Sequence, residues 1–120
     1  MKKKIYGDSD PLYTIKKGYD ENTRMLMFHS TPIEAELLQE AIDLIGEYNE
    51  FNPKKVGKVL TETFKNGVRY VIGREFSVAI YVIPIQPYLF WAEDLKKLQK
   101  AGKIDEVAVT NEGRLRLWWD

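Results

Sequence analysis

The chain has 120 residues, of which 44% are hydrophobic and 30% charged, so it has the size and apolar content of one ordinary globular domain. Its 18 basic and 18 acidic residues balance, which gives no bulk attraction to nucleic acid, and the lack of cysteine excludes disulfides and thiolate metal sites. The longest apolar run, 78–85, is far shorter than the roughly 20 residues that span a bilayer. We therefore expect one compact cytoplasmic domain over residues 1–120, without membrane contact and without a cofactor.

The first elements are expected to be two strands joined by a turn. Residues 12–15 and 24–28 are short, mostly apolar runs that predict strands, and the polar stretch 18–22 between them predicts a turn.

Two consecutive helices are predicted to follow. The Thr-Pro-Ile-Glu sequence at 31–34 is a capping box, and apolar residues recur behind it at helical spacing, which predicts a helix over 31–50. Asn52 and Pro53 repeat the combination of an N-cap and a proline and predict a second helix over 53–66. The threonines at 61 and 63 also allow a strand in that segment.

The rest of the chain predicts a hairpin, a short helix and a second hairpin. Residues 68–72 and 76–83 are expected to pair around a turn at 73–75, with the second strand central and covered on both faces, because its apolar residues barely alternate. A helix over 93–101 and strands at 104–109 and 114–119 complete the order β-β-α-α-β-β-α-β-β. This order predicts an α+β fold: a mostly antiparallel sheet with helices on one face.

His29 is the only histidine and the only side chain whose ordinary pKa lies near neutral pH. It precedes the predicted helix start, where Ser30, Thr31 and free amides could hold a phosphate while His29 acts as general acid or nucleophile. The competing interpretation is structural: His29 makes a local hydrogen bond at a strand end, and Thr31 only caps the helix. The sequence shows no cluster of metal ligands at helical spacing.

The His-Ser-Thr sequence at 29–31 resembles the Gly-His-x-Ser-Thr element of the viral ring nucleases, which cleave cyclic oligoadenylate. The strand, helix and strand over 79–109 are also similar to the end of that family. The chain lacks the glycine, has a spacing one residue shorter, and adds a helix and a terminal hairpin. The alternative function that this resemblance implies is that of a nucleotide phosphodiesterase in which His29 acts.

Charge is segregated between the two predicted helices. No lysine or arginine occurs between Met25 and Pro53, and four acidic residues are expected to share one helix face away from the apolar side: Glu36, Glu40, Asp43 and Glu47. The second helix carries a basic stripe of Lys54, Lys58 and Lys65, which is the alternative phosphate-binding surface. The acidic face predicts docking to a protein with a basic surface. The competing interpretations are solvated faces or neutralisation between the two helices.

Aromatic residues at the end of the chain give a second candidate surface. Trp118 and Trp119 point to opposite faces of a strand, so one of them is expected to face a partner or a second copy of the chain, unless both close the core. A homodimer through this terminal strand is a further hypothesis.

The function predicted from these features is that of a small binding or regulatory protein, of the accessory or inhibitor type, rather than an enzyme. The second alternative is a winged-helix nucleic-acid binder over 93–120, although that segment has no net positive charge and direct nucleic-acid binding is not expected.

Overall fold

The structure, a computed structural model, describes residues 10–22, 25–87 and 90–120. In these ranges the helices are α1 (Pro11–Gly18), α2 (Leu38–Asp43), α3 (Pro53–Phe64) and α4 (Ala92–Gly102), and the 3-10 helix η1 (Ala35–Leu37) precedes α2. The strands are β1 (Met27–His29), β2 (Ile33–Glu34), β3 (Val68–Glu75), β4 (Ser77–Pro84), β5 (Glu106–Val109) and β6 (Leu115–Trp118).

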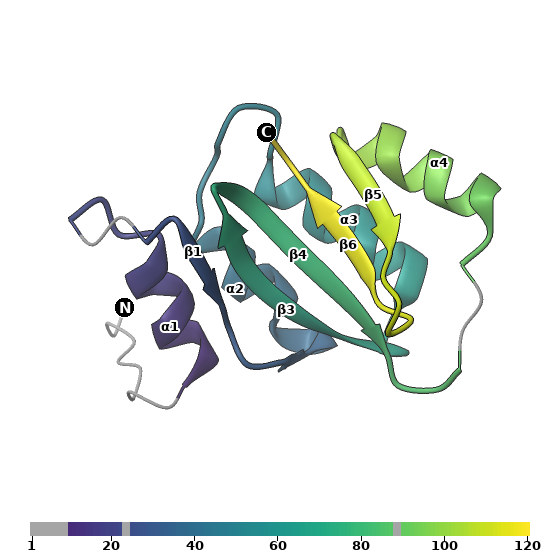
Figure 1. Cartoon of the computed structure of the whole chain (residues 1–120), viewed down its shortest axis with the longest axis horizontal. Coiled ribbons are helices and arrows are strands. Elements are labelled where there is room, and N and C mark those ends of the chain that lie inside the picture. The colour runs from purple at the N-terminus through teal and green to yellow at the C-terminus, as the bar shows by residue number, and fades with distance from the viewer. Residues whose placement is uncertain (1–9, 23–24, 88–89) are drawn as a thin grey trace.

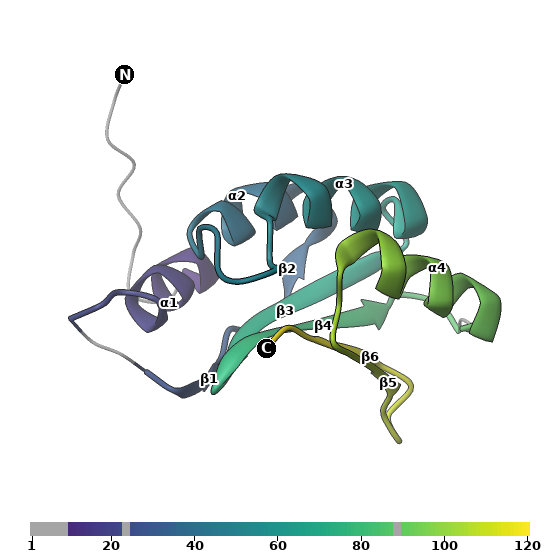
Figure 2. The ribbon, with the colours of Figure 1, turned by 90° about the horizontal axis from the view of Figure 1, so that it is seen from above.

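The strands form one antiparallel sheet with the helices on one of its faces. The strand order is β1-β3-β4-β6-β5, and the short β2 pairs along the same edge of β3 as β1 (Figure 1). Figure 2 shows α1, α2, α3 and α4 on the same side of the sheet. The predicted α+β class, with a mostly antiparallel sheet and helices on one face, is confirmed.

The hydrophobic core lies between the sheet and this helix layer. Ile72 of β3 and Ile80 of β4 are fully buried there. Trp119 follows β6 and is also fully buried; its ring meets Phe51 edge to face at 5.0 Å, and its Nε1–H donates to the Gly102 carbonyl at 2.9 Å. Trp119 therefore joins the end of the chain to the entry of α3 and the end of α4.

The strand predicted at 12–15 is wrong, because these residues lie in α1. Asp10 is the N-cap of this helix: its side chain accepts a hydrogen bond from the Leu12 amide at 2.9 Å, and Pro11 occupies the first turn. Leu12 and Ile15 are three residues apart and both enter the core. The local cap therefore outweighs the strand preference of the segment. The second predicted strand is present as β1, and Arg24 lies outside the described residues.

The helix predicted at 31–50 is wrong in its start and its length. Residues 33–34 form β2 instead, because Ile33 pairs with Tyr70 of β3 and buries its side chain in the core. Thr31 therefore caps no helix. Helical geometry begins only at η1, and α2 ends at Asp43. Pairing with β3 thus overrides the local capping signal.

The second helix of the predicted pair is confirmed as α3. The side chain of Asn52 accepts hydrogen bonds from the amides of Lys54 and Lys55 at 3.1 and 3.2 Å, and Pro53 is in the first turn. The alternative strand in this segment is excluded, since Thr61 and Thr63 lie in the last turns of α3.

The central hairpin is confirmed, but its turn lies at Phe76 rather than at 73–75. Residues 73–75 all pair with β4, and the last pair is Glu75 with Ser77. Phe76 has a φ of 65°, which is uncommon for a bulky residue, and its side chain is 68% exposed. β4 is the central strand, as predicted, but the helices cover only one of its faces, so the expectation of cover on both faces is wrong.

The C-terminal helix and hairpin are present as α4, β5 and β6. β6 pairs with β4 from Ala79 opposite Trp118 to Val82 opposite Leu115. The hairpin is thus part of the main sheet and does not stand apart as the wing of a winged helix does. Of the helices in the described ranges, none has the length and apolar character to cross a membrane.

Candidate functional site

The sheet face opposite the helices, which we call the open face, carries a cluster of polar and aromatic side chains. Residues in register on neighbouring antiparallel strands point to the same side. One register row joins His29, Gly73, Ala79 and Trp118, and another joins Tyr81 with Arg116. The open face comprises Met27, His29, Glu75, Tyr81, Ile83, Arg116 and Trp118.

Glu75 is the centre of this cluster. Its Oε2 accepts hydrogen bonds from His29 Nε2 at 2.7 Å and from the Tyr81 hydroxyl at 2.6 Å. Its Oε1 lies 2.8 Å from both Nε and Nη2 of Arg116. The Trp118 indole donates to the Glu75 carbonyl at 2.9 Å. Three strands, β1, β4 and β6, therefore hold open-face side chains against this residue of β3.

The carboxylate of Glu75 is ionised in this setting. Burial by itself raises its pKa, but the hydrogen bonds from Tyr81, His29 and Arg116 and the charge of Arg116 outweigh burial and hold the pKa below its ordinary value. Burial and the interaction with Glu75 raise the pKa of Tyr81, so its phenol stays protonated and donates. An ionised carboxylate can only accept hydrogen bonds. The Nε2 atom of His29 therefore carries the proton in this contact, and Nδ1 is the ring nitrogen that does not face Glu75.

Gly73 allows His29 to reach Glu75. A Cβ atom at position 73 would lie 2.4 Å from the Phe28 carbonyl oxygen and 2.8 Å from Cδ2 of His29. The imidazole of His29 therefore lies across β3 at Gly73, and any other residue at position 73 would displace it. It also meets the Tyr81 ring edge to face at 5.7 Å. The His29 side chain is 45% exposed, against 14% for Glu75, so the imidazole is the accessible part of the pair.

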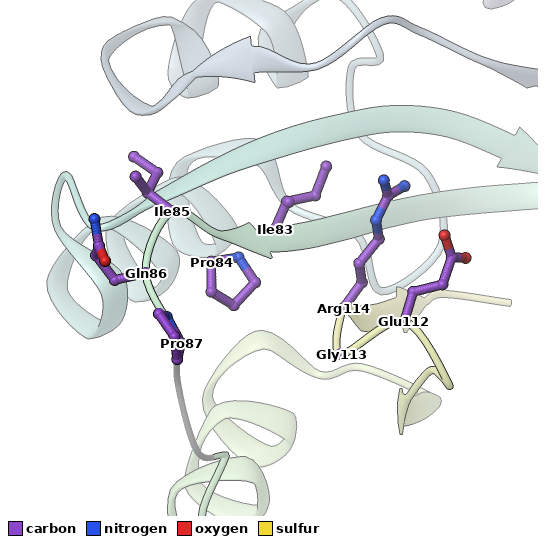
Figure 3. A pocket seen from close by; sticks show the side chains of 8 residues that line it. All are labelled: Ile83, Pro84, Ile85, Gln86, Pro87, Glu112, Gly113 and Arg114. Atoms are coloured by element: carbon purple, nitrogen blue, oxygen red, sulfur yellow. The ribbon is translucent and has the colours of Figure 1, made fainter.

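An open depression of about 490 Å³ adjoins the end of β4 and the turn before β6. Its lining residues are Ile83, Pro84, Ile85, Gln86, Pro87, Glu112, Gly113 and Arg114. Figure 3 shows the side chains of Ile83 and Arg114 pointing the same way from neighbouring segments. Because Ile83 follows Tyr81 by two residues and Arg114 precedes Arg116 by two, the depression continues the open face toward this end of the sheet.

The structure does not bring the four predicted acidic residues together on one long helix. Glu36 lies in η1, Glu40 and Asp43 lie in α2, and Glu47 follows the helix. Asp43 accepts a hydrogen bond from Gln39 at 2.8 Å. Glu36, Asp43 and Glu47 are exposed, so a role in partner binding stays a prediction, but without the single continuous face.

The residues of the predicted phosphate sites are dispersed. Lys54 and Lys58 are exposed on α3, and Lys65 is its C-cap with a φ of 51°. Ser30 is buried: its hydroxyl donates to the Thr31 carbonyl at 2.8 Å and accepts from the Ile72 amide at 3.1 Å. Ser30 therefore has a structural role, and the helix start expected at Thr31 does not exist.

The two tryptophans point to opposite sides, as predicted. Trp118 lies on the open face and is half-buried, whereas Trp119 is inside the core and cannot contact a partner. β6 is hydrogen-bonded to β4 on one side and to β5 on the other, so a second copy cannot pair with its backbone. The sheet edge at this end is β5.

Three members of the cluster, Glu75, Tyr81 and Arg116, were not found by sequence reasoning. Glu75 lies 46 residues from His29 along the chain, and Tyr81 and Arg116 lie still farther from it. For Tyr81 and Arg116 the signal is the strand period of two, which places Tyr81 with Ile83, and Arg116 with Trp118, on one face; no such signal marks Glu75.

The described residues contain no group of three or more histidine, aspartate or glutamate side chains that could hold a metal ion. No protein-family model, no curated protein and no solved structure matches the chain. The similarity to the viral ring nucleases is therefore limited to short sequence elements.

Proposed function

We propose that this protein is a binding module that captures a partner protein on the open face of its sheet. The observation that carries the proposal is the Glu75-centred cluster, which holds Arg116, Tyr81 and Trp118 in fixed positions on a face without a covering helix layer. Arginine, tyrosine and tryptophan are the side chains most enriched among residues that dominate binding energy.

Preorganisation supports this role. A long side chain that is ordered only on binding costs about 0.5–1.5 kcal/mol of conformational entropy. Arg116 is already held by Glu75 at 2.8 Å and by Glu106 at 3.2 Å, and Trp118 by its indole hydrogen bond. Arg116 and Trp118 would therefore bind a partner without this cost in conformational entropy.

The charges of the open face favour a protein over a nucleic acid. Arg116 is paired with Glu75 and Glu106, and Arg69 is paired with Glu34 at 3.1 Å. Nucleic-acid affinity depends on uncompensated cations that contact phosphates. A face on which Arg116 and Arg69 are paired with carboxylates, with exposed Met27 at its margin, fits a mixed polar and apolar protein surface better.

Replacing Arg116 or Trp118 with alanine is expected to weaken capture of the partner by about 30-fold, the equivalent of a hot-spot loss of about 2 kcal/mol. The measurement is affinity capture from lysate with the immobilised chain, followed by titration of the protein so identified. Lys58→Ala, on the exposed side of α3, is the matched control and should bind as the unchanged chain does. Equal binding by all variants would rule out the open face as the contact surface.

A second candidate function, hydrolysis of a nucleotide phosphodiester, is favoured by the contact between His29 and Glu75. A carboxylate that fixes the orientation of an imidazole is the arrangement of a general acid or base. Arg116 lies on the same carboxylate and could stabilise negative charge on a phosphate.

For this candidate, His29→Gln is expected to reduce hydrolysis of cyclic or linear oligoadenylate by about 100-fold or more. Product formation would be followed by chromatography, with Glu36→Gln as the control at an exposed site away from the cluster. Hydrolysis that is the same in His29→Gln and in the unchanged chain would eliminate this role of His29.

A further inference from the structure

The strand β5 forms one edge of the sheet. Among the described strands it pairs only with β6, and Glu106 to Val109 follow Trp118 to Leu115 without interruption. Its start lies beside α4, whereas its far end points away from the helix layer (Figure 2). The outer side of β5 therefore offers backbone groups to which a further strand can bind.

The hydrogen bonds at the end of β5 show which backbone groups face outward. The Thr110 amide donates to the Arg114 carbonyl at 2.7 Å, so Thr110 is bonded toward β6. Bonded positions alternate along an antiparallel strand, and Ala108 is therefore also bonded toward β6. The N–H and C=O groups of Val107 and Val109 consequently face away from β6, where no other described strand pairs with them.

The sequence of β5 lacks the features by which edge strands usually avoid pairing. Between Glu106 and Val109 there is no lysine, proline or bulge. The only charged residue of the strand, Glu106, is paired with Arg116 at 3.2 Å. Val109 is 49% exposed, although valine favours a strand with neighbours on both sides. The opposite edge of the sheet, by contrast, is divided between the short strands β1 and β2.

The order of side chains on β5 fits a second copy of the same strand. A twofold axis normal to the sheet at Ala108 sets Val107 of each copy opposite Val109 of the other. Both valines have outward backbone groups, so each such pair exchanges two hydrogen bonds. Val107 already packs against the core, and Val109 of the second copy extends that apolar contact. On the open face Glu106 meets Thr110, so like charges do not oppose one another.

The neighbouring register is less favourable. A twofold axis at Val107 would set Asp105 opposite Val109 of the second copy. The Asp105 amide already donates to the Trp118 carbonyl at 3.0 Å and is not free to bond across that pair. The register centred on Ala108 is therefore the one that uses all the outward groups of both valines.

We propose that two copies of the chain pair antiparallel along β5, with Ala108 of one copy opposite Ala108 of the other, and so form one continuous sheet. The twofold axis leaves both open faces on the same side, and the dimer presents two Glu75 clusters there. The pairing does not depend on the proposed binding function, since Val107 and Val109 lie outside the Glu75 cluster.

Disulfide trapping tests the register, because the chain has no cysteine of its own. Ala108→Cys places the only thiol at the centre of the pairing, where facing Cα atoms lie about 4.5 Å apart, within the range of a disulfide. Under mild oxidation this variant is expected to form a covalent dimer at least about tenfold faster than Ala101→Cys, the same change at an exposed position of α4. Equal rates for the two variants would overturn the proposed pairing.

Sedimentation equilibrium from about 10 µM to about 1 mM measures the dissociation constant of the dimer. Val109→Pro removes an outward N–H without removing a bond to β6, and it is expected to raise this constant at least about tenfold. Val109→Lys keeps the backbone and adds a charge at the edge, so it should weaken the dimer as well. Circular dichroism checks that both variants keep the fold. An unchanged chain that stays monomeric over this range, or equal dimerisation in both variants, would overturn the proposal.

Discussion

Replacing Trp119 with alanine is expected to lower the free energy of unfolding by about 3–5 kcal/mol. The change removes a fully buried indole and its edge-to-face contact with Phe51, and it leaves the Gly102 carbonyl without its donor. Total stabilities of small domains are about 5–15 kcal/mol, so the loss is a large share. Urea unfolding followed by circular dichroism measures it.

Trp118→Ala is the matched control for this experiment. Trp118 is half-buried on the open face and loses one indole hydrogen bond to the Glu75 carbonyl, so a loss nearer to 1 kcal/mol is expected. Equal losses in the two variants, or a larger loss for Trp118, would contradict the placement of Trp119 in the core and of Trp118 on the surface.

Glu75→Gln is expected to lower the free energy of unfolding by about 2 kcal/mol at neutral pH. The amide keeps the shape of the side chain but loses the charge that accepts hydrogen bonds from His29, Tyr81 and Arg116. Arg116 retains Glu106, at 3.2 Å, which limits the loss. Glu36→Gln, at an exposed position, is the control and should change stability little.

This loss is expected to depend on pH. The pKa of Glu75 is lowered in the folded protein, because the hydrogen bonds and the charge of Arg116 outweigh the opposing effect of burial. Its ionised form therefore stabilises the fold fully above the ordinary pKa of 4.5, and this contribution is lost as the pH falls through the folded-state value. Urea unfolding from pH 7 down to pH 3 should show the unchanged chain and Glu75→Gln converging below about pH 4.5. A constant difference over this range would show that Glu75 is not stabilised as an anion.

Local signals in the sequence predicted most of the fold, and long-range pairing explains the failures. Asn52 and Pro53 correctly predicted the start of α3, because a cap acts within one helical turn. The Thr-Pro-Ile-Glu sequence at 31–34 is a similar signal, yet the edge of β3 takes up Ile33 and moves the helix start to a later residue. The turn at Phe76 was missed because a bulky residue seldom adopts positive φ.

The candidate site was predicted only in part. His29 could be found from composition, and the opposite directions of Trp118 and Trp119 follow from the period of a strand. Glu75 could not be recognised, because its role depends on the register of β1 on β3 and of β4 on β6, which single-sequence patterns do not determine. The acidic residues at 36–47 formed a pattern only on the assumption of one long helix.

Photo-crosslinking from two exposed positions tests most directly whether the open face is the binding surface. A photoreactive amino acid would replace Met27, on the open face, or Glu36, in η1 on the side of the helices. We predict that the captured partner crosslinks to the chain from position 27 and not from position 36. Crosslinking from position 36 alone would contradict the account and return the binding role to the acidic residues of η1 and α2.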